Sequence, residues 1–315
     1  MQSRDAGRNR VMARPEGGYV GRFSPSPTGP LHLGSAAAAL ASYLDARAHD
    51  GRWLLRIEDL DTPRAVAGAS EFIQGQLRFL GMNSKEPVMF QSRRSSRYQQ
   101  AFGHLAAAGR VFGCACSRRE VADSLPVPGD GPGLRQRDPI YPGTCRFKIP
   151  GGHPPRSWRF LVEDGPVAFE DRWLGPQHQE PAVDTGDFVI RRADGLWAYQ
   201  LAVTVDDGDS GVTHVVRGQD ILGSTGRQIQ LQRALDLPTP AYLHIPLALG
   251  TDGEKLSKQN GAASITGAQP SHPSRQPCDL LDQAATVLMM QPPATRDLES
   301  WLTQATRQWA LRFRS

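Results

Sequence analysis

The sequence predicts an α/β protein that contains a parallel β-sheet. The clearest signal lies in residues 18–59, which run from an apolar-leaning strand through a proline-rich loop and an alanine-rich helix to a second strand. A strand, a crossover helix and a second strand of this length form a βαβ unit, whose strands lie parallel in one sheet. Further strand and helix patterns follow, and 315 residues suffice for about two domains of ordinary size.

The elements can be assigned in order along the chain. Residues 18–23 are a short strand, and the loop after them holds three prolines that prevent regular structure. Residues 34–48 are a helix and residues 52–57 a strand. The later pattern predicts helices at 65–81, 93–112, 224–235 and most of 280–313, strands at 158–162, 167–169, 188–191, 197–205, 212–216 and 242–248, and an irregular insertion at 121–143.

The composition is that of a globular protein. Hydrophobic residues make up 39% of the chain and charged residues 22%, which argues against a mostly disordered protein. No apolar run approaches the roughly 20 residues that span a bilayer, so a transmembrane protein is excluded, and without a secretory signal we expect a cytoplasmic one. Residues 1–17 hold four arginines and predict a flexible basic tail. The net charge of +4 is compatible with a polyanionic partner.

The loop RFSPSPTGPLHLGS at residues 22–35 is the first candidate binding site. It precedes a helix, and an open parallel sheet binds ligands outside the carboxyl ends of its strands. Helix N-terminal N–H groups and the imidazole of His32 suit a phosphate, while Gly34 and Ser35 let a nucleotide come close. The alternative is a proline-rich turn with a helix cap.

A second candidate, Lys255-Leu256-Ser257-Lys258, stands in a polar loop. Two lysines three residues apart can clamp a triphosphate, because lysine acts as a mobile point charge. Taken alone, this pattern is more often an ordinary surface loop.

Together and in this order, HLGS and KLSKQ resemble the two signature motifs of class I aminoacyl-tRNA synthetases. The segments RFSPSPTGPLHLGS, LLRIEDLDTPR and VVRGQDILGSTGRQIQLQRAL narrow the resemblance to the glutamyl/glutaminyl branch, over residues 18–262. The resemblance implies a Rossmann-like, doubly wound parallel sheet with a zinc-stabilised insertion and a small helical C-terminal region. It also implies that a carboxylate is joined to the α-phosphate of ATP and then passed to a nucleophile on RNA.

By this resemblance, the catalytic residues are His32 and Lys258. ATP would contact His32, Gly34, Ser35, Lys255, Ser257 and Lys258, with Mg²⁺ expected on its phosphates. Glutamate would contact Arg22, Phe23, Ser24, Pro25, Ser26, Glu58, Tyr199 and Arg217. The chemistry fits, because two arginines can pair with the carboxylates of glutamate, a carboxylate can hold its ammonium, and a phenol both donates and accepts. Ser35 departs from the signature, which has a histidine there.

Three of the four cysteines lie close in sequence. Cys114 and Cys116 flank one residue, and Cys145 follows 29 residues after Cys116. Zinc prefers four tetrahedral ligands, and thiolates are common among them. The pattern resembles the zinc insertion of the glutamyl branch, which makes Tyr141 the expected fourth ligand and His153 the alternative. We expect one structural Zn²⁺ per chain; the alternative is three reduced thiols.

The C-terminal part distinguishes members of the branch. Residues 259–315, 57 in number, are too few for the anticodon-binding domain of a glutamyl enzyme or the β-barrels of a glutaminyl enzyme. The chain therefore resembles the truncated paralogues, the glutamyl-Q tRNA(Asp) synthetase family. That family activates glutamate with ATP without RNA and transfers it to queuosine at the wobble position of tRNA(Asp). The implied partners are L-glutamate, ATP and the tRNA(Asp) anticodon stem-loop carrying queuosine.

Two other functions stay open: a truncated glutamyl-tRNA synthetase that charges tRNA(Glu), and a non-catalytic glutamate or nucleotide sensor. We expect a monomer that does not contact a membrane, and an acidic turn at Asp206, Asp207 and Asp209. The predicted division is 1–17 basic tail, 18–113 first half of the catalytic domain, 114–185 zinc-containing insertion and connective strands, 186–261 second half with the KLSK loop, and 262–315 helical C-terminal region.

Overall fold

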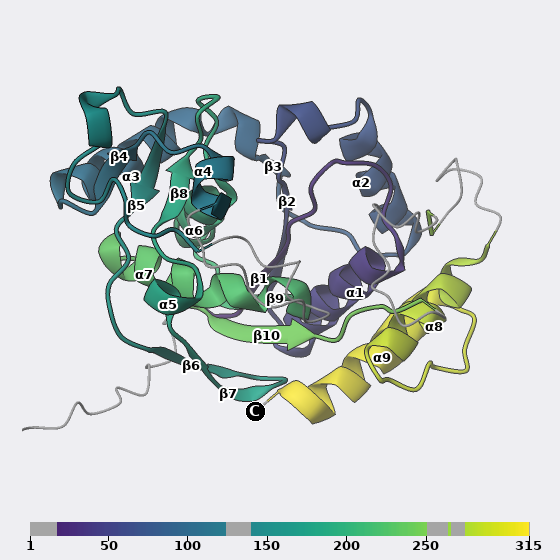
Figure 1. Cartoon of the computed structure of the whole chain (residues 1–315). Helices are drawn as coiled ribbons and strands as arrows, with labels where there is room; N and C mark the ends of the chain where they lie inside the picture. The colour runs from purple at the N-terminus through teal and green to yellow at the C-terminus, as the bar shows by residue number, and fades with distance from the viewer. Residues whose placement is uncertain (1–17, 124–139, 251–263, 266–274, 315) are drawn as a thin grey trace, which may run out of the picture.

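A parallel sheet in two segments forms the centre of the computed structural model, which describes residues 18–123, 140–250, 264–265 and 275–314. The first segment has the order β1-β2-β3 and the second β7-β6-β10-β9 (Figure 1). The two meet where the backbone N–H of Thr213, beside β9, donates to the carbonyl of Val20 in β1, over 2.9 Å. The strands are β1 Val20–Phe23, β2 Arg52–Ile57, β3 Met89–Phe90, β6 Val167–Asp171, β7 Gly175–Gln179, β9 His214–Gly218 and β10 Ala241–Ile245.

All neighbours in this sheet are parallel except β6 and β7, which confirms the predicted parallel sheet. The central strands β9 and β10 are buried on both faces, because alternate side chains enter different apolar clusters. Val215 and Tyr242 pack on one side with Ile229 of α7, while Val216 and Leu243 pack on the other. The second side is covered by α1 Leu33–Ala48, α8 Pro277–Val287 and α9 Leu298–Phe313, and the first by α7 Thr225–Ala234. Helix α6 Tyr199–Asp209 packs beside α7 and joins β1 and β2 through ion pairs of Asp207.

A smaller antiparallel sheet, β4-β5-β8, carries the cysteine segment. Its strands are β4 Val111–Cys114, β5 Ser157–Phe160 and β8 Phe188–Arg191, and they share an apolar cluster with α3 Ser95–Ala107 and α6. The remaining helical elements are α2 Ala69–Phe79, α4 Arg118–Asp123, α5 Pro181–Asp184, and the 3-10 turns η1 Thr62–Arg64, η2 Gln91–Arg93, η4 Pro150–Gly152 and η5 Gln219–Ser224. The proposed five-part division stays a prediction; β6 from the third part pairs with β10 from the fourth.

The strand expected at 197–205 is wrong, because most of this run belongs to helix α6. Leu201, Ala202 and Val205 enter one apolar cluster at helical spacing. Residues 201–205 of this run are all buried, so they have no periodicity that separates a strand from a helix, which explains the error. The helix expected at 93–112 is also too long: it ends at Ala107, and β4 begins at Val111.

A buried carboxylate joins α1 to distant parts of the chain. Asp45 is 0% exposed and accepts hydrogen bonds from the Tyr19 hydroxyl, both Nη atoms of Arg172 and the indole of Trp309. Burial alone would raise the pKa of Asp45, but these donors outweigh it and lower the pKa. The carboxylate thus ties α9 and the end of β6 to the first βαβ unit. None of the described helices is long and apolar enough to cross a membrane.

We predict that Asp45→Ala lowers the free energy of unfolding by about 3–5 kcal/mol, because it leaves a largely buried guanidinium without its partner. Urea unfolding at pH 7 measures this. Glu86→Ala is the control, since it breaks an exposed Arg52 ion pair and should cost at most about 1 kcal/mol. The difference in the free energy of unfolding between wild type and Asp45→Ala should shrink below about pH 4. The pKa of Asp45 is lower in the folded than in the unfolded state, so its carboxylate stabilises the fold above the unfolded pKa. This stabilisation is lost as the pH falls and the carboxylate is protonated. Equal losses in both variants would contradict the prediction.

Candidate active site

A cavity of about 340 Å³ lies beyond the carboxyl ends of β1, β2 and β9, at the start of α6. Ligands of open α/β sheets bind in this place. Its lining residues are Arg22, Phe23, Ser24, Ser26, Ala38, Glu58, Tyr199, Val216, Arg217, Gly218 and Ile221. Seven of the eight residues predicted to contact glutamate are therefore brought together. Pro25 is not in the lining, but its carbonyl accepts the backbone N–H of Glu58 over 3.0 Å and so holds the loop against β2.

A chain of ion pairs runs behind this cavity. The Nε of Arg22 lies 3.1 Å from Oδ1 of Asp207, and Nη1 of Arg56 lies 2.6 Å from the same oxygen. Nη2 of Arg56 lies 3.2 Å from Oε1 of Glu58. Burial would raise the pKa of Asp207, but the two guanidinium groups outweigh it and lower the pKa. Within the described part of the chain, no hydrogen bond uses the Nη atoms of Arg22, which leaves them for a ligand.

Glu58 is the acidic group of the cavity. Its side chain is 9% exposed, and burial raises its pKa although Arg56 and Arg22 both favour the charged form. No hydrogen bond within the described residues uses its Oε2. A cation bound beside Glu58, such as an ammonium group, would pair with this second oxygen.

Arg217 differs from the other two arginines, because it lies within 4.0 Å of no carboxylate among the described residues. It is 5% exposed. Its Nε donates to Nε2 of His244 over 3.0 Å, Nη1 to Oε1 of Gln228 over 2.7 Å, and Nη2 to Oγ1 of Thr225 over 2.8 Å. These bonds use three of the five N–H groups of the guanidinium, so two remain. A buried cation without a counterion is costly, and an anionic ligand in the cavity would supply one.

The predicted ATP residues His32, Gly34 and Ser35 begin α1. His32 is the helix cap: its Nδ1 accepts from the N–H of Ser35 over 3.4 Å, and its own N–H donates to Oγ of Ser35 over 2.8 Å. Ser35 therefore completes a reciprocal cap of a 16-residue helix in the place where the signature has histidine. A Cβ on Gly34 would lie 3.1 Å from the His32 ring, so glycine permits this packing. Lys255, Ser257 and Lys258 lie outside the described residues.

Tyr199 occupies the first turn of α6, with 36% of its surface exposed. The same helix places Asp206 and Asp207 at its other end. They were expected in an acidic turn, and that expectation is wrong: Asp206 is 0% exposed and bonds to Arg94, Gln91 and Tyr98. The sequence did not reveal Asp207 and Arg56 as parts of the site. Only a helix at 199–209 places the carboxylates of Asp206 and Asp207 near β1 and β2, and a strand was expected there.

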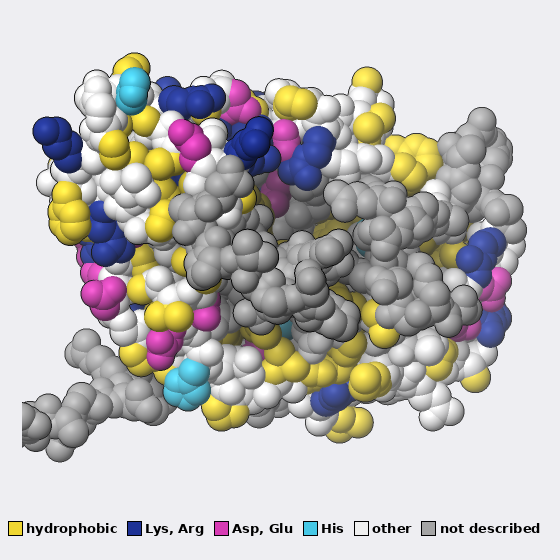
Figure 2. Space-filling model, viewed as in Figure 1, with side chains coloured by type: hydrophobic (Ala, Val, Ile, Leu, Met, Phe, Trp, Pro, Cys, Tyr) yellow, Lys and Arg dark blue, Asp and Glu magenta, His cyan; other side chains and the backbone are white. Residues whose placement is uncertain are grey.

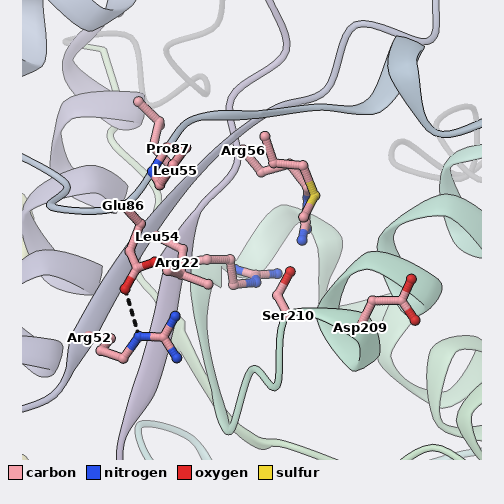
Figure 3. A pocket seen from close by; sticks show the side chains of 10 residues that line it. Arg22, Arg52, Leu54, Leu55, Arg56, Glu86, Pro87, Asp209 and Ser210 are labelled. Carbon is pink, nitrogen blue, oxygen red and sulfur yellow. Dashed lines mark hydrogen bonds and ion pairs between the residues drawn. The ribbon is translucent and has the colours of Figure 1, made fainter.

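A second cavity, of about 380 Å³, lies between β2, β3 and the C-terminal end of α6 (Figure 3). Arg22 lines both cavities, and the exposed Arg52–Glu86 ion pair, 2.9 Å long, lines this one as well. No other residue predicted for the site borders it. The smaller cavity is therefore the candidate active site, because the convergent unpaired polar atoms are there.

The cysteine cluster forms in the antiparallel region. The Sγ atoms of Cys114, Cys116 and Cys145 all lie within 4.8 Å of one another, and those of Cys116 and Cys145 are 3.6 Å apart. Bonds of about 2.3 Å to a tetrahedral Zn²⁺ put two sulfurs about 3.8 Å apart, so the three thiols fit such an ion. The hydroxyl of Tyr141 lies 3.5 Å from Sγ of Cys114, whereas His153 is exposed and does not belong to this cluster. Burial first, then the neighbouring thiols, raise the pKa of Cys116 to about 12, which a bound cation would reverse.

A known protein family matches most of the chain. The family model for the catalytic domain of class I tRNA synthetases (E and Q) matches residues 19–124 and 146–297. The chain is thus a class I tRNA synthetase, a ligase-type enzyme. The chain belongs, within this class, to the glutamyl-Q tRNA(Asp) synthetase family, because curated relatives with that name are 50–56% identical to it over 80–97% of its length.

Curated relatives carry that family name. The protein from Bordetella bronchiseptica is 52% identical over 312 residues, covering 97% of this chain and 93% of its own length. The protein from Burkholderia mallei is 56% identical over 255 residues, covering 80% and 84%. The solved glutamate-tRNA synthetase of Elizabethkingia anophelis is 26% identical with a TM-score of 0.72. The match covers 93% of this chain but only 65% of the chain in that structure.

We predict that the purified protein contains about one zinc per chain and that Cys145→Ser lowers this content. Tyr141→Phe tests the fourth ligand: its zinc should be lost to a chelator faster than that of wild type, because the phenol oxygen is removed from the cluster. His153→Ala is the matched control and should behave as wild type. Atomic absorption and chelator competition measure both. Loss of zinc in His153→Ala, with retention in Tyr141→Phe, would reverse the assignment.

Proposed function

We propose that this enzyme activates L-glutamate with ATP, without RNA, and transfers the glutamyl group to queuosine at the wobble position of tRNA(Asp). Support comes from relatives that carry this name at 50% identity and above. The structural observation that carries the proposal is Arg217, a buried cation for which the described part of the chain supplies no carboxylate partner, in one cavity with Arg22 and Glu58.

Glutamate complements this cavity in charge. It has two carboxylates and one ammonium, and the lining offers two guanidinium groups with unused N–H donors and one carboxylate with an unused oxygen. Planar guanidinium groups suit carboxylates because they can donate two parallel hydrogen bonds. Glutamine would bring a neutral amide to Arg217 and leave its charge unbalanced, so the pocket should favour glutamate.

The proposed activation needs no protein nucleophile. An oxygen of the substrate carboxylate attacks the α-phosphorus of ATP, the bond to the β-phosphate oxygen breaks, and pyrophosphate leaves. Catalysis then rests on positioning and charge neutralisation, for which His32, Lys255 and Lys258 are the proposed groups, with Mg²⁺ on the phosphates. In the second step, a hydroxyl of the queuosine cyclopentene diol attacks the acyl carbon, loses its proton, and AMP leaves.

The RNA partner would meet a surface of mixed charge on a chain that is basic overall. On the face shown in Figure 2, Lys and Arg side chains gather over the region where Figure 1 places α4 and β3, with acidic side chains between them. The net charge of +4 favours a polyanion. We propose the tRNA(Asp) anticodon stem-loop as the partner, a cytoplasmic location and a monomeric enzyme.

The decisive experiment measures both steps. Glutamate should drive ATP–pyrophosphate exchange without tRNA, and labelled glutamate should then attach to tRNA(Asp) that contains queuosine. The same tRNA without queuosine and tRNA(Glu) are the controls and should stay unlabelled. Label on tRNA(Glu) would favour the truncated synthetase instead, and absence of exchange would favour the sensor.

We predict that Arg217→Lys raises the KM for glutamate by about 10- to 100-fold, because lysine keeps the charge but loses the bidentate fork. The KM for ATP should stay near that of wild type. Arg307→Lys, on the exposed side of α9, is the matched control and should leave both constants unchanged. Exchange kinetics at varied glutamate and ATP give these values. An unchanged KM for glutamate in Arg217→Lys would exclude this residue as its ligand.

A further inference from the structure

Asp171, His244 and Arg217 form a line of buried hydrogen bonds behind the candidate active site. Asp171 stands at the end of β6, His244 on β10 and Arg217 on β9, and these strands are neighbours in the sheet. The exposed fractions of the three residues are 1%, 0% and 5%. Oδ2 of Asp171 lies 2.6 Å from Nδ1 of His244, and Nε2 of His244 lies 3.0 Å from Nε of Arg217.

The chemistry of arginine decides where the imidazole proton resides. A guanidinium has only donors, so Nε2 of His244 must accept, and the proton of the neutral ring stays on Nδ1. Nδ1–H then donates to Asp171. Thr225, whose Oγ1 lies 3.3 Å from Nε2 of His244, also accepts from Nη2 of Arg217. The neutral tautomer with its proton on Nδ1 therefore satisfies every member of this group.

The carboxylate of Asp171 is itself held in one orientation. Its Oδ1 accepts the backbone N–H groups of Trp173 and Leu174, each over 3.0 Å, and Oδ2 faces the imidazole. The backbone N–H of His244 lies between the two oxygens, 3.2 Å from each. The backbone N–H groups of Trp173 and Leu174 cannot turn away from Oδ1, so Oδ1 must remain an acceptor. Only Oδ2 is available to select the tautomer of His244.

We propose that Asp171 and His244 are positioning residues for the glutamate site: Asp171 selects the tautomer of His244, which orients Arg217 so that its two unused N–H groups face the substrate carboxylate. This proposal rests on the proposed glutamate site. In this arrangement the hydrogen-bond partner of the Arg217 Nε is a neutral imidazole instead of an anion. A carboxylate in direct contact would neutralise the guanidinium and compete with the substrate, whereas imidazole fixes its direction and leaves its charge available.

The test is Asp171→Asn. The backbone N–H groups of Trp173 and Leu174 hold the amide oxygen of the new side chain, so its NH₂ points at Nδ1 of His244 and forces the proton onto Nε2, against Arg217. We expect the KM for glutamate to rise about 10- to 100-fold, the range for losing a hydrogen bond to a charged group, with kcat and the KM for ATP little changed. In ¹⁵N-edited spectra of the imidazole, the protonated nitrogen should change from Nδ1 to Nε2.

Two further variants keep the proposal testable if Asp171→Asn does not fold. His244→Gln can place an amide oxygen where Nε2 was and should retain more glutamate affinity than His244→Asn, which reaches only the Nδ1 position. His178→Gln, on the exposed side of β7, is the control and should match wild type. The proposal is overturned if folded Asp171→Asn keeps the wild-type KM for glutamate, if its tautomer is unchanged, or if His244→Gln and His244→Asn are equally impaired. Absence of glutamate-driven exchange in wild type would instead contradict the proposed function, and the tautomer measurement would still decide the orientation of His244.

Discussion

The carboxylate of Asp207, placed between two buried guanidinium groups, is the interaction on which the candidate site depends. It joins α6 to β1 through Arg22 and to β2 through Arg56. Without a shared anion, two arginines on neighbouring strands would repel each other in a region of low dielectric. With it, the Nε of Arg22 is anchored and its terminal nitrogens remain for a ligand. The same contact sets the position of α6, whose first turn brings Tyr199 to the cavity.

The three buried arginines of the site are neutralised in different ways. Arg22 and Arg56 share internal carboxylates, so their charges are largely balanced before any ligand arrives. Arg217 is surrounded by neutral groups: an imidazole, an amide and a hydroxyl. An acidic substrate therefore gains most at Arg217. Among the described residues of the site, Arg217 is thus the arginine without a carboxylate partner, while the charges of Arg22 and Arg56 are already balanced by carboxylates.

The rest of the molecule supports this sheet edge from both sides. Alanines on the buried face of α1 let the helix lie close to β1 and β9, and Asp45 ties it to α9 and the end of β6. Asp171, which binds His244 of the site, is followed directly by Arg172, which binds Asp45 of α1. Two consecutive residues therefore connect the site with the scaffold. The cysteine cluster lies in the separate antiparallel region, where it can stabilise a segment with few apolar contacts of its own.

The sequence alone was enough to predict the βαβ unit, the parallel sheet, the class of enzyme and most of the residues that line the cavity, because these depend on local patterns and short motifs. The helix at Tyr199–Asp209 was not predictable in this way, since its central residues, 201–207, are all buried and show no amphipathic period. The partners of the motif residues were also hidden. Asp207 bonds to Arg22 across 185 positions, and His244 bonds to Asp171 across 73. Which charges are balanced and which remain for a substrate was decided only by the tertiary structure, because hydrogen bonds and burial depend on distances that the order of residues does not contain.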